Sequence, residues 1–212
     1  MKTTLMLTVF AFVSAALCIR GRYADRPTQV FVFKPLTTAL ILGIVLARAL
    51  PNISSYAALV LAAMVFCLAG DIFLMLPDEW FVAGLSSFLV GHLFLIAAFV
   101  LGGLRPTWWF ALLFCSLAIT MYRVFSPYLG SMKLPVAIYV VVISVMVWLA
   151  WEALVSNRDA GHLLAASGAT LFMISDSALA LNRFRLKFRG ADLVVLGTYW
   201  LSLWLIALSV GR

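Results

Sequence analysis

Residues 55–76, SYAALVLAAMVFCLAGDIFLML, decide the fold class of this chain. The stretch is long enough to cross a bilayer as a helix of about 20 residues, and its single charged residue, Asp71, comes close to its end. Comparable apolar stretches predict helices near residues 3–19, 30–49, 55–76, 81–103, 106–124, 134–153, 162–182 and 190–210. The predicted fold is therefore all-α, a polytopic integral membrane bundle of about eight transmembrane helices.

The composition supports lipid as the outer solvent. The chain has 212 residues, of which 65% are hydrophobic and 11% charged, whereas soluble proteins are about 25% charged. Eight spans with short loops occupy nearly the whole length, so we expect a single transmembrane domain, residues 1–212. The first span lacks a small-x-small cleavage motif at Cys18-Ile19-Arg20, which favours a retained helix over a signal peptide.

The net charge of +7 resides in short loops and indicates topology, not nucleic-acid binding. The odd loops, counted from the N-terminus, carry most bases: Arg20, Arg22, Arg26, Lys34, Arg123, Lys133, Arg183, Arg185, Lys187 and Arg189. The even loops and the termini carry Lys2, Arg48, Arg105, Arg158 and Arg212. The positive-inside rule then predicts cytoplasmic odd loops and both termini opposite the cytoplasm, in the cell membrane if the source is bacterial. The oligomeric state stays open.

The cysteines do not indicate a disulfide framework or a metal site. Cys18, Cys67 and Cys115 lie within apolar segments without CxxC spacing. We expect buried thiols that act as small apolar fillers, and no metal or other cofactor.

Polar residues within the spans are the candidate functional residues. An ionisable group in lipid costs at least about 2.5–3.5 kcal/mol, so each needs a partner, a water-filled cavity or a function. The predicted topology puts almost all of them in the cytoplasmic half: Lys34, Asp71, His92, Tyr139, Asp176, Asn182 and Tyr199. We expect Asp71 and Asp176 to share a cavity near His92, and an almost purely apolar opposite half. This profile is typical of a pocket for an amphiphile.

A structural role remains open for each of these residues. Asp71 and Asp176 could simply pair with Lys34 or His92, and the small residues beside them, such as Ser175, could serve helix packing. Asp78, in the third loop, could frame the mouth of a pocket.

The two aspartates also lie in a weak internal repeat. Residues 70–76, GDIFLML, end the third predicted helix, and residues 175–181, SDSALAL, end the seventh. Lys34-Pro35 opens the second predicted helix and Lys133-Leu134-Pro135 opens the sixth. Two parallel units of four helices would explain this register, and chance similarity between apolar segments remains the alternative.

An ordered set of short motifs resembles the YhhN family of membrane lysoplasmalogenases. The set comprises Lys34-Pro35-Leu36, Gly70-Asp71, Gly91-His92, Ser175-Asp176 and Thr198-Tyr199. The resemblance implies hydrolysis of the alkenyl ether bond of a lysoplasmalogen, a lysophospholipid of the bilayer. The products would be a fatty aldehyde and a glycerophosphoethanolamine or glycerophosphocholine.

This reaction requires a proton donor and a negative charge that faces an oxocarbenium ion, and paired carboxyl groups can supply both. We therefore predict Asp71 and Asp176 as catalytic residues, with His92 orienting the water or a carboxylate. Lys34 would meet the substrate phosphate or hold one aspartate ionised. The remaining predicted substrate-binding residues are Tyr139, Tyr199, Asn182, Asp78 and Ser175. The alternatives are a transporter or proton-coupled carrier with Asp71 and Asp176 as a relay, and a non-catalytic lipid-binding protein.

Overall fold

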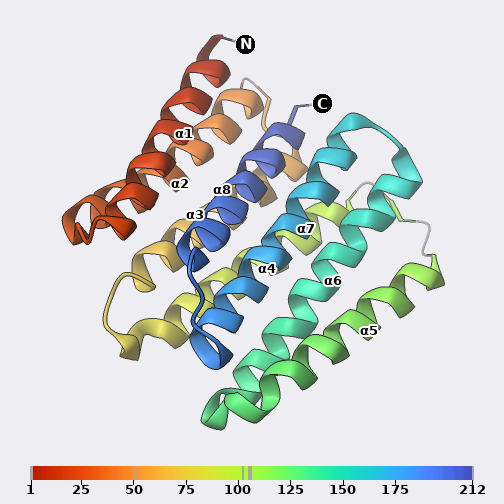
Figure 1. Ribbon diagram of the computed structural model, residues 1–212. Helices are drawn as coiled ribbons and strands as arrows, with labels where there is room; N and C mark the ends of the chain where they lie inside the picture. Colours follow the sequence, from red (N-terminus) through yellow and green to blue (C-terminus); the bar gives the residue numbers. More distant parts are fainter. Residues whose placement is uncertain (1, 51, 102, 105–106, 212) are drawn as a thin grey trace.

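A computed structural model describes residues 2–50, 52–101, 103–104 and 107–211, and within these ranges it contains helices and no strand (Figure 1). The helices are α1 (Lys2–Tyr23), α2 (Pro27–Ala49), α3 (Ser55–Phe73), α4 (Phe81–Val100), α5 (Trp108–Phe125), α6 (Lys133–Asn157), α7 (Ala160–Ala180) and α8 (Ala191–Ser209). Short 3-10 turns are η1 (Asp78–Trp80), η2 (Ser126–Tyr128) and η3 (Gly130–Met132). A π-helical turn, η4 (Leu181–Arg185), extends α7.

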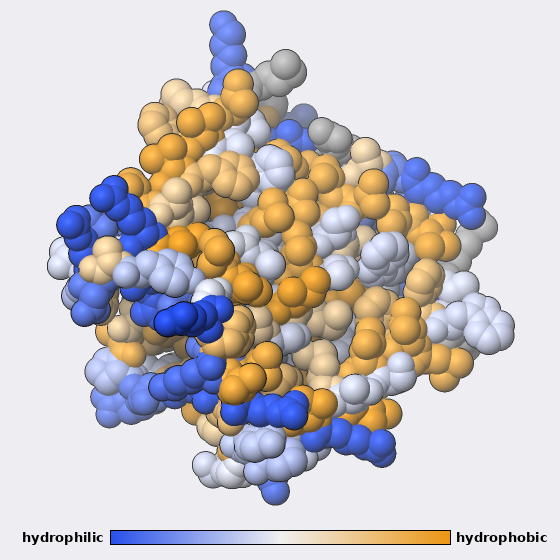
Figure 2. Space-filling view, viewed as in Figure 1, coloured by the Kyte–Doolittle hydropathy of each residue, from blue (hydrophilic) through white to orange (hydrophobic). Residues whose placement is uncertain are grey.

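The prediction of an all-α bundle with eight spanning helices is confirmed. Eight helices of the described chain are long and apolar enough to cross a membrane, and large apolar side chains such as Leu112 and Leu134 are exposed on the outside. Figure 2 shows hydrophobic residues over the middle of the molecule and hydrophilic residues gathered toward the helix ends. The chain is therefore a multi-pass membrane protein, with both termini at the same end of the bundle (Figure 1).

Two predicted helix ends were wrong in ways that move candidate residues. α2 begins at Pro27 instead of near residue 30, because a proline is well accommodated in the first turn of a helix. Lys34 therefore lies two turns inside α2, followed by the internal Pro35, and it does not open the helix. α3 ends at Phe73 instead of residue 76, so Asp71 lies in its last turn. The predicted start of the fifth helix at residue 106, Arg105 and Arg212 lie outside the described residues.

The helices pack in a pattern that fits the predicted four-plus-four repeat. The sequential pairs α1–α2, α3–α4, α5–α6 and α7–α8 are in contact, α2 packs on α3 and α8, and α6 packs on α7 and α4. The contacts of α2 with α3 and α8 correspond to those of α6 with α7 and α4, the helices four positions away along the chain. The two aspartate-bearing helices, α3 and α7, thereby occupy comparable places, each between the helix that precedes it and the helix that follows it.

Small residues let these pairs approach closely. A Cβ atom on Gly70 would lie 2.7 Å from the Phe88 ring, and one on Gly168 would lie 2.9 Å from the carbonyl oxygen of Ser202. Close approach without a side chain is a common device in membrane helix packing. The small residues of α3 and α7 thus have a packing role.

The expectation of buried thiols was wrong for one cysteine. Cys18 and Cys67 are buried, whereas Cys115 is exposed on α5. α5 lies at one edge of the bundle beside α6 (Figure 1). Most of its surface therefore faces the surroundings, where its apolar residues contact lipid.

Candidate active site

A cavity of about 760 Å³ opens between the helix ends on the face opposite the termini. We call it the vestibule. Most of the predicted site residues line it: Lys34, Asp71, Asp78, Ser175, Asp176, Asn182 and Tyr199. Its wall also carries Arg22, Asp25, Arg26, Arg183, Lys187 and Asp192. Of these residues, the sequence analysis placed Asp78 at the mouth of a pocket. The folded chain brings both intramembrane aspartates, Asp71 and Asp176, to one cavity.

Asp71 lies at the inner wall of the vestibule in a network of charged and polar donors. Its Oδ2 accepts hydrogen bonds from Thr38 Oγ1 at 2.6 Å and from Tyr199 Oη at 2.9 Å. Lys34 Nζ is 3.3 Å from its Oδ1 and also donates to the Asp71 carbonyl oxygen at 3.2 Å. The Asp71 side chain is only 2% exposed. A buried carboxylate in this setting has one cation and two hydroxyl groups to balance its charge.

The network depends on helix spacing that the sequence analysis missed. Lys34 and Thr38 are four residues apart on α2, so both side chains project from the same face toward α3. Thr38 is itself held in place, because Trp200 Nε1 donates to its Oγ1 at 3.2 Å. The i, i+4 pairing of a lysine with a threonine was the signal that could have identified Thr38.

Asp176 has fewer partners than Asp71. Tyr139 Oη donates to its Oδ2 at 2.5 Å, and His92 Nε2 lies 4.0 Å from the same oxygen. Its side chain is 16% exposed, and it lines both the vestibule and a second pocket. The distance to His92 is too long for a direct hydrogen bond. Among the described residues, Tyr139 is therefore the side chain that bonds this carboxyl group.

His92 lies behind Asp176, deep in the bundle, and it lines neither the vestibule nor the neighbouring pocket. It is fully buried, and neither ring nitrogen has a hydrogen-bond partner in the described part of the chain. Its ring packs edge-on against Phe172 and Tyr139, with centroid separations of 4.6 and 5.2 Å. His92 is thus close to Asp176 but does not line the vestibule.

A cluster of aromatic rings lies between Tyr199, the partner of Asp71, and His92, the neighbour of Asp176. Phe172 contacts His92 on one side and Tyr199 on the other, where the centroid separation is 5.5 Å. Phe88 packs edge-on against both Phe172 and Tyr199, at 6.2 and 5.8 Å. These contacts place the Asp71 partner Tyr199 and the Asp176 neighbour His92 on opposite sides of one aromatic cluster. The two carboxyl groups can therefore differ in environment although they line one cavity.

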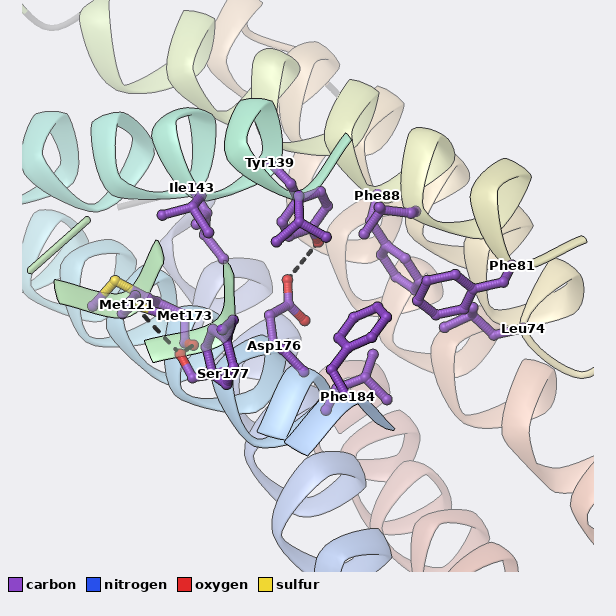
Figure 3. Close-up of a pocket in the computed structure, with 16 residues that line it drawn as sticks. Leu74, Phe81, Phe88, Met121, Tyr139, Ile143, Met173, Asp176, Ser177 and Phe184 are labelled. Atoms are coloured by element: carbon purple, nitrogen blue, oxygen red, sulfur yellow. Dashed lines mark hydrogen bonds between the residues drawn. The ribbon is translucent and has the colours of Figure 1, made fainter. Parts of the chain in front are cut away.

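A second pocket, almost entirely apolar, adjoins Asp176 between α4, α5, α6 and α7 (Figure 3). In Figure 3 the Asp176 carboxyl group lies centrally, with Tyr139 above it and Phe184 beside it. Asp176 lines this pocket and the vestibule, whereas Asp71 lines the vestibule alone. The carboxyl group of Asp176 is therefore at the boundary between polar and apolar space.

The remaining predicted site residues make contacts within the protein. Ser175 donates to the carbonyl oxygen of Val195 at 2.8 Å, which joins α7 to α8. Asn182 Oδ1 accepts from the Phe188 backbone N–H at 3.4 Å. Asp78 accepts from Arg183 at 3.1 Å at the vestibule rim.

One buried carboxyl group corrects the expectation of an almost purely apolar opposite half. Glu152, near the end of α6 on the termini side, is fully buried. It accepts hydrogen bonds from the Thr107 backbone N–H and from Trp148 Nε1, each at 2.8 Å. Glu152 thus holds Thr107, the residue that precedes α5, through its backbone N–H and its hydroxyl group, a local requirement that hydropathy does not reveal.

Fold and cavity together define a class: multi-pass membrane proteins in which intramembrane carboxyl groups from separate helices line one cavity. Within that class the chain belongs to the YhhN family, whose model matches residues 29–210. The predicted resemblance is therefore confirmed.

Individual relatives extend the comparison. The chain is 34% identical to human lysoplasmalogenase TMEM86A over 71% of its own length and 64% of the relative, so it spans about two thirds of that protein. It is 33% identical to rat lysoplasmalogenase TMEM86B over 89% of its length and 76% of the relative. The membrane protein YhhN of Escherichia coli O157:H7 is 28% identical over 93% of this chain and 95% of its own. No solved structure matches the chain significantly.

Proposed function

We propose that this protein is an intramembrane hydrolase that cleaves the alkenyl ether bond of lysoplasmalogens. Two relatives that are 34% and 33% identical to this chain over the aligned residues are named lysoplasmalogenase. The observation that carries the proposal is the position of Asp71 and Asp176 on one cavity that adjoins an apolar pocket. The substrate has the same division, a polar head, a reactive ether and an alkyl chain.

The reaction starts with protonation of the outer alkene carbon, which converts the vinyl ether to an oxocarbenium ion. Water then adds to the cationic carbon and loses a proton, which gives a hemiacetal. The hemiacetal collapses to a fatty aldehyde and the glycerophospho-ethanolamine or -choline alcohol. The enzyme therefore needs one carboxyl group that donates a proton and a second that opposes the cation.

Asp176 suits the role of proton donor. Its carboxyl group borders the apolar pocket and has one hydroxyl partner, Tyr139. A carboxyl group with few donors in apolar surroundings favours its neutral form. In this position it can deliver a proton to the chain side of the ether, where the alkene carbon must lie.

Asp71 suits the role of the anion. Lys34, Thr38 and Tyr199 all direct a cation or a hydroxyl group at its carboxylate. Hydrogen bonds and an opposite charge favour the ionised form. From the vestibule wall Asp71 can face the oxocarbenium ion and accept the proton that the attacking water loses.

His92 and the rim residues have supporting roles in this proposal. His92 is a positioning residue behind Asp176, since it touches Tyr139 and approaches Asp176 to 4.0 Å without lining the cavity. At the rim, Lys187 and the Asp78–Arg183 pair line the vestibule where a phosphate and an amine would lie. The head group would thus meet charges of both signs.

The transporter alternative has less support. A relay through the bilayer needs polar groups that continue from the vestibule to the opposite face. The buried carboxyl group in that half, Glu152, is engaged by Thr107 and Trp148 and lines neither cavity. Asp71 and Asp176 both line cavities near the same face.

Release of free aldehyde from a purified preparation tests the proposal. Detergent-solubilised protein is incubated with an alkenyl lysophosphatidylethanolamine, and aldehyde and glycerophosphoethanolamine are quantified together. We expect equal amounts of both products, and none from the saturated alkyl ether, which has no alkene to protonate. Absence of aldehyde from a folded preparation, or equal cleavage of the saturated ether, would refute it.

The proposed orientation puts the vestibule on the cytoplasmic side of the cell membrane. The supporting observation is that Arg22, Arg26, Arg183 and Lys187 line this one cavity, as the positive-inside rule expects of a cytoplasmic face. A reporter that functions only outside the cytoplasm should then be active when it is fused after the last residue. A cytoplasmic signal from that fusion would reverse the orientation and the compartment that the vestibule faces.

A further inference from the structure

The vestibule and the apolar pocket are adjoining parts of one space. Six residues line both: Leu74, Phe81, Phe88, Asp176, Leu179 and Phe184. Phe81 and Phe184 face each other edge-on across this shared wall, with ring centroids 6.0 Å apart. Asp176 is the one ionisable residue in the set, so its carboxyl group lies where the two cavities meet.

The two sides of this boundary differ in charge. The vestibule side carries Lys34, Asp71 and the charged rim. The pocket side beyond Asp176 is formed by Met121 and Phe125 of α5, Ile143 of α6 and Met173 of α7, among other apolar residues. Figure 3 shows Met121, Met173 and Ile143 together on one side of Asp176, and Leu74, Phe81 and Phe184 on the other.

We infer that the apolar pocket is the binding site for the alkenyl chain and that Met173 and Ile143 form its floor. This inference rests on the proposed function. In an alkenyl ether the carbon that takes the proton is the second carbon of the chain, so the chain must start at the proton donor. With the head group in the charged vestibule, the apolar space that touches Asp176 is the pocket, and the chain leaves the donor in that direction.

Helix spacing gives the depth of the floor. Met173 precedes Asp176 by three residues on α7, and Ile143 follows Tyr139 by four residues on α6. Each is about one helical turn, roughly 5 Å, deeper in the membrane than the carboxyl group or its hydroxyl partner. Bulk added there meets the chain a few carbons beyond the reacting bond.

α5 forms one wall of the apolar pocket. The pocket has a volume of about 50 Å³, room for only the first few carbons. α5 packs mainly on α6, and Glu152 anchors its first turn through Thr107 at 2.8 Å. The pocket side chains Met121 and Phe125 come from the other end of α5, where Phe125 packs in a buried cluster with Val136 and Val140 of α6.

A size change at Met173 tests the floor. Met173→Trp should lower kcat/KM for the hexadec-1-enyl substrate by at least about tenfold, because a filled pocket excludes the chain. The prop-1-enyl analogue with the same head group should lose less than about threefold, since its chain ends before the floor. Ile174→Trp is the matched control, because Ile174 is 44% exposed on the outer face of α7 and lines neither cavity. Equal losses on both chain lengths in a folded Met173→Trp protein would overturn the inference.

Photolabelling of the unaltered protein gives a second test that does not require hydrolysis. The probe is a saturated alkyl lysophosphatidylethanolamine with a diazirine on the fourth or fifth chain carbon, and labelled peptides are mapped by mass spectrometry. Label on the peptides that contain Met121, Ile143 or Met173 supports the chain site. Label confined to the outer face of α1 would contradict it. If the protein labels at the pocket yet releases no aldehyde from either chain length, the proposed reaction fails and the chain site stands.

Discussion

The surroundings of Asp71 and Asp176 differ although the two residues occupy comparable places in the two halves of the bundle. Each follows a small residue, Gly70 or Ser175, near the end of its helix. Each accepts a hydrogen bond from a hydroxyl group on the preceding helix, that of Thr38 for Asp71 and that of Tyr139 for Asp176. The similarity ends there, because the other contacts of the two carboxyl groups differ.

Asp71 has a cation and a second hydroxyl group beside it, whereas Asp176 has an uncharged apolar border. The Lys34 ammonium lies 3.3 Å from Asp71, whereas the basic side chain beside Asp176 is His92, at 4.0 Å. A pair of carboxyl groups with opposed environments is the arrangement that separates an acid from an anion. Similar backbone positions in the two halves therefore hold two carboxyl groups in different environments.

The largest expected effects come from the removal of either carboxyl group. Asp176→Asn keeps the side-chain volume and removes the proton donor, and Asp71→Asn removes the anion. Each should reduce kcat for aldehyde release by about 10²–10⁴-fold, the usual contribution of general acid–base catalysis. Size-exclusion profiles and thermal stability should show that both variants remain folded. Near-normal turnover in either variant would remove that residue from the mechanism.

Lys34→Met is expected to have the next largest effect. It leaves the Asp71 carboxylate buried without its cation, which is costly. We expect a loss of about 10²-fold in kcat/KM that is equal for a phosphate-bearing substrate and for a neutral glycerol alkenyl ether.

The double variant Lys34→Met with Asp71→Asn distinguishes the two roles of this lysine. If Lys34 acts through Asp71, the double variant should be no worse than Asp71→Asn alone. A loss confined to the phosphate-bearing substrate, and additive with Asp71→Asn, would instead assign Lys34 to the head group.

Removal of the two tyrosine hydroxyl groups compares the two environments directly. Tyr139→Phe takes away the hydroxyl partner of Asp176, whereas Tyr199→Phe leaves Asp71 with Thr38 and Lys34. We expect a loss of about tenfold in kcat for Tyr139→Phe and about two- to threefold for Tyr199→Phe. Steady-state kinetics on one alkenyl substrate decides the order, and a larger loss for Tyr199→Phe would reverse the assigned roles.

Hydropathy alone predicted most of the fold, because lipid requires a continuous apolar helix for every span. The errors came from local rules that hydropathy ignores, such as the tolerance of Pro27 at a helix start and the early end of α3 at Phe73. The positions of Asp71 and Asp176 along their helices were enough to predict that both lie near the same membrane face. The sequence could not indicate how far each helix is rotated.

Rotation about the helix axes explains the unpredicted parts of the site. His92 lies at the expected depth, but α4 turns it behind Asp176 and away from the vestibule. Thr38 was overlooked since threonine is unremarkable in a membrane helix, and its importance follows only from the position of α3. The aromatic cluster of Phe88, Phe172 and Tyr199 combines side chains from α4, α7 and α8, so it forms only when these three helices pack together.

Glu152 is the third buried carboxyl group, and it should show the smallest effect on activity. Its bonds run to Thr107 and Trp148, both far from the vestibule wall, so it stabilises the start of α5 and touches no part of the proposed reaction path. Glu152→Gln keeps the Oε1 acceptor but replaces Oε2, which accepts from the Thr107 hydroxyl group, and this should lower stability by about 1–3 kcal/mol. Thermal unfolding in detergent measures that loss, while kcat per folded molecule should stay within about twofold of the unaltered protein. A loss of turnover as large as that of Asp176→Asn would mean that burial and charge, not position at the shared cavity, determine which carboxyl groups this protein needs.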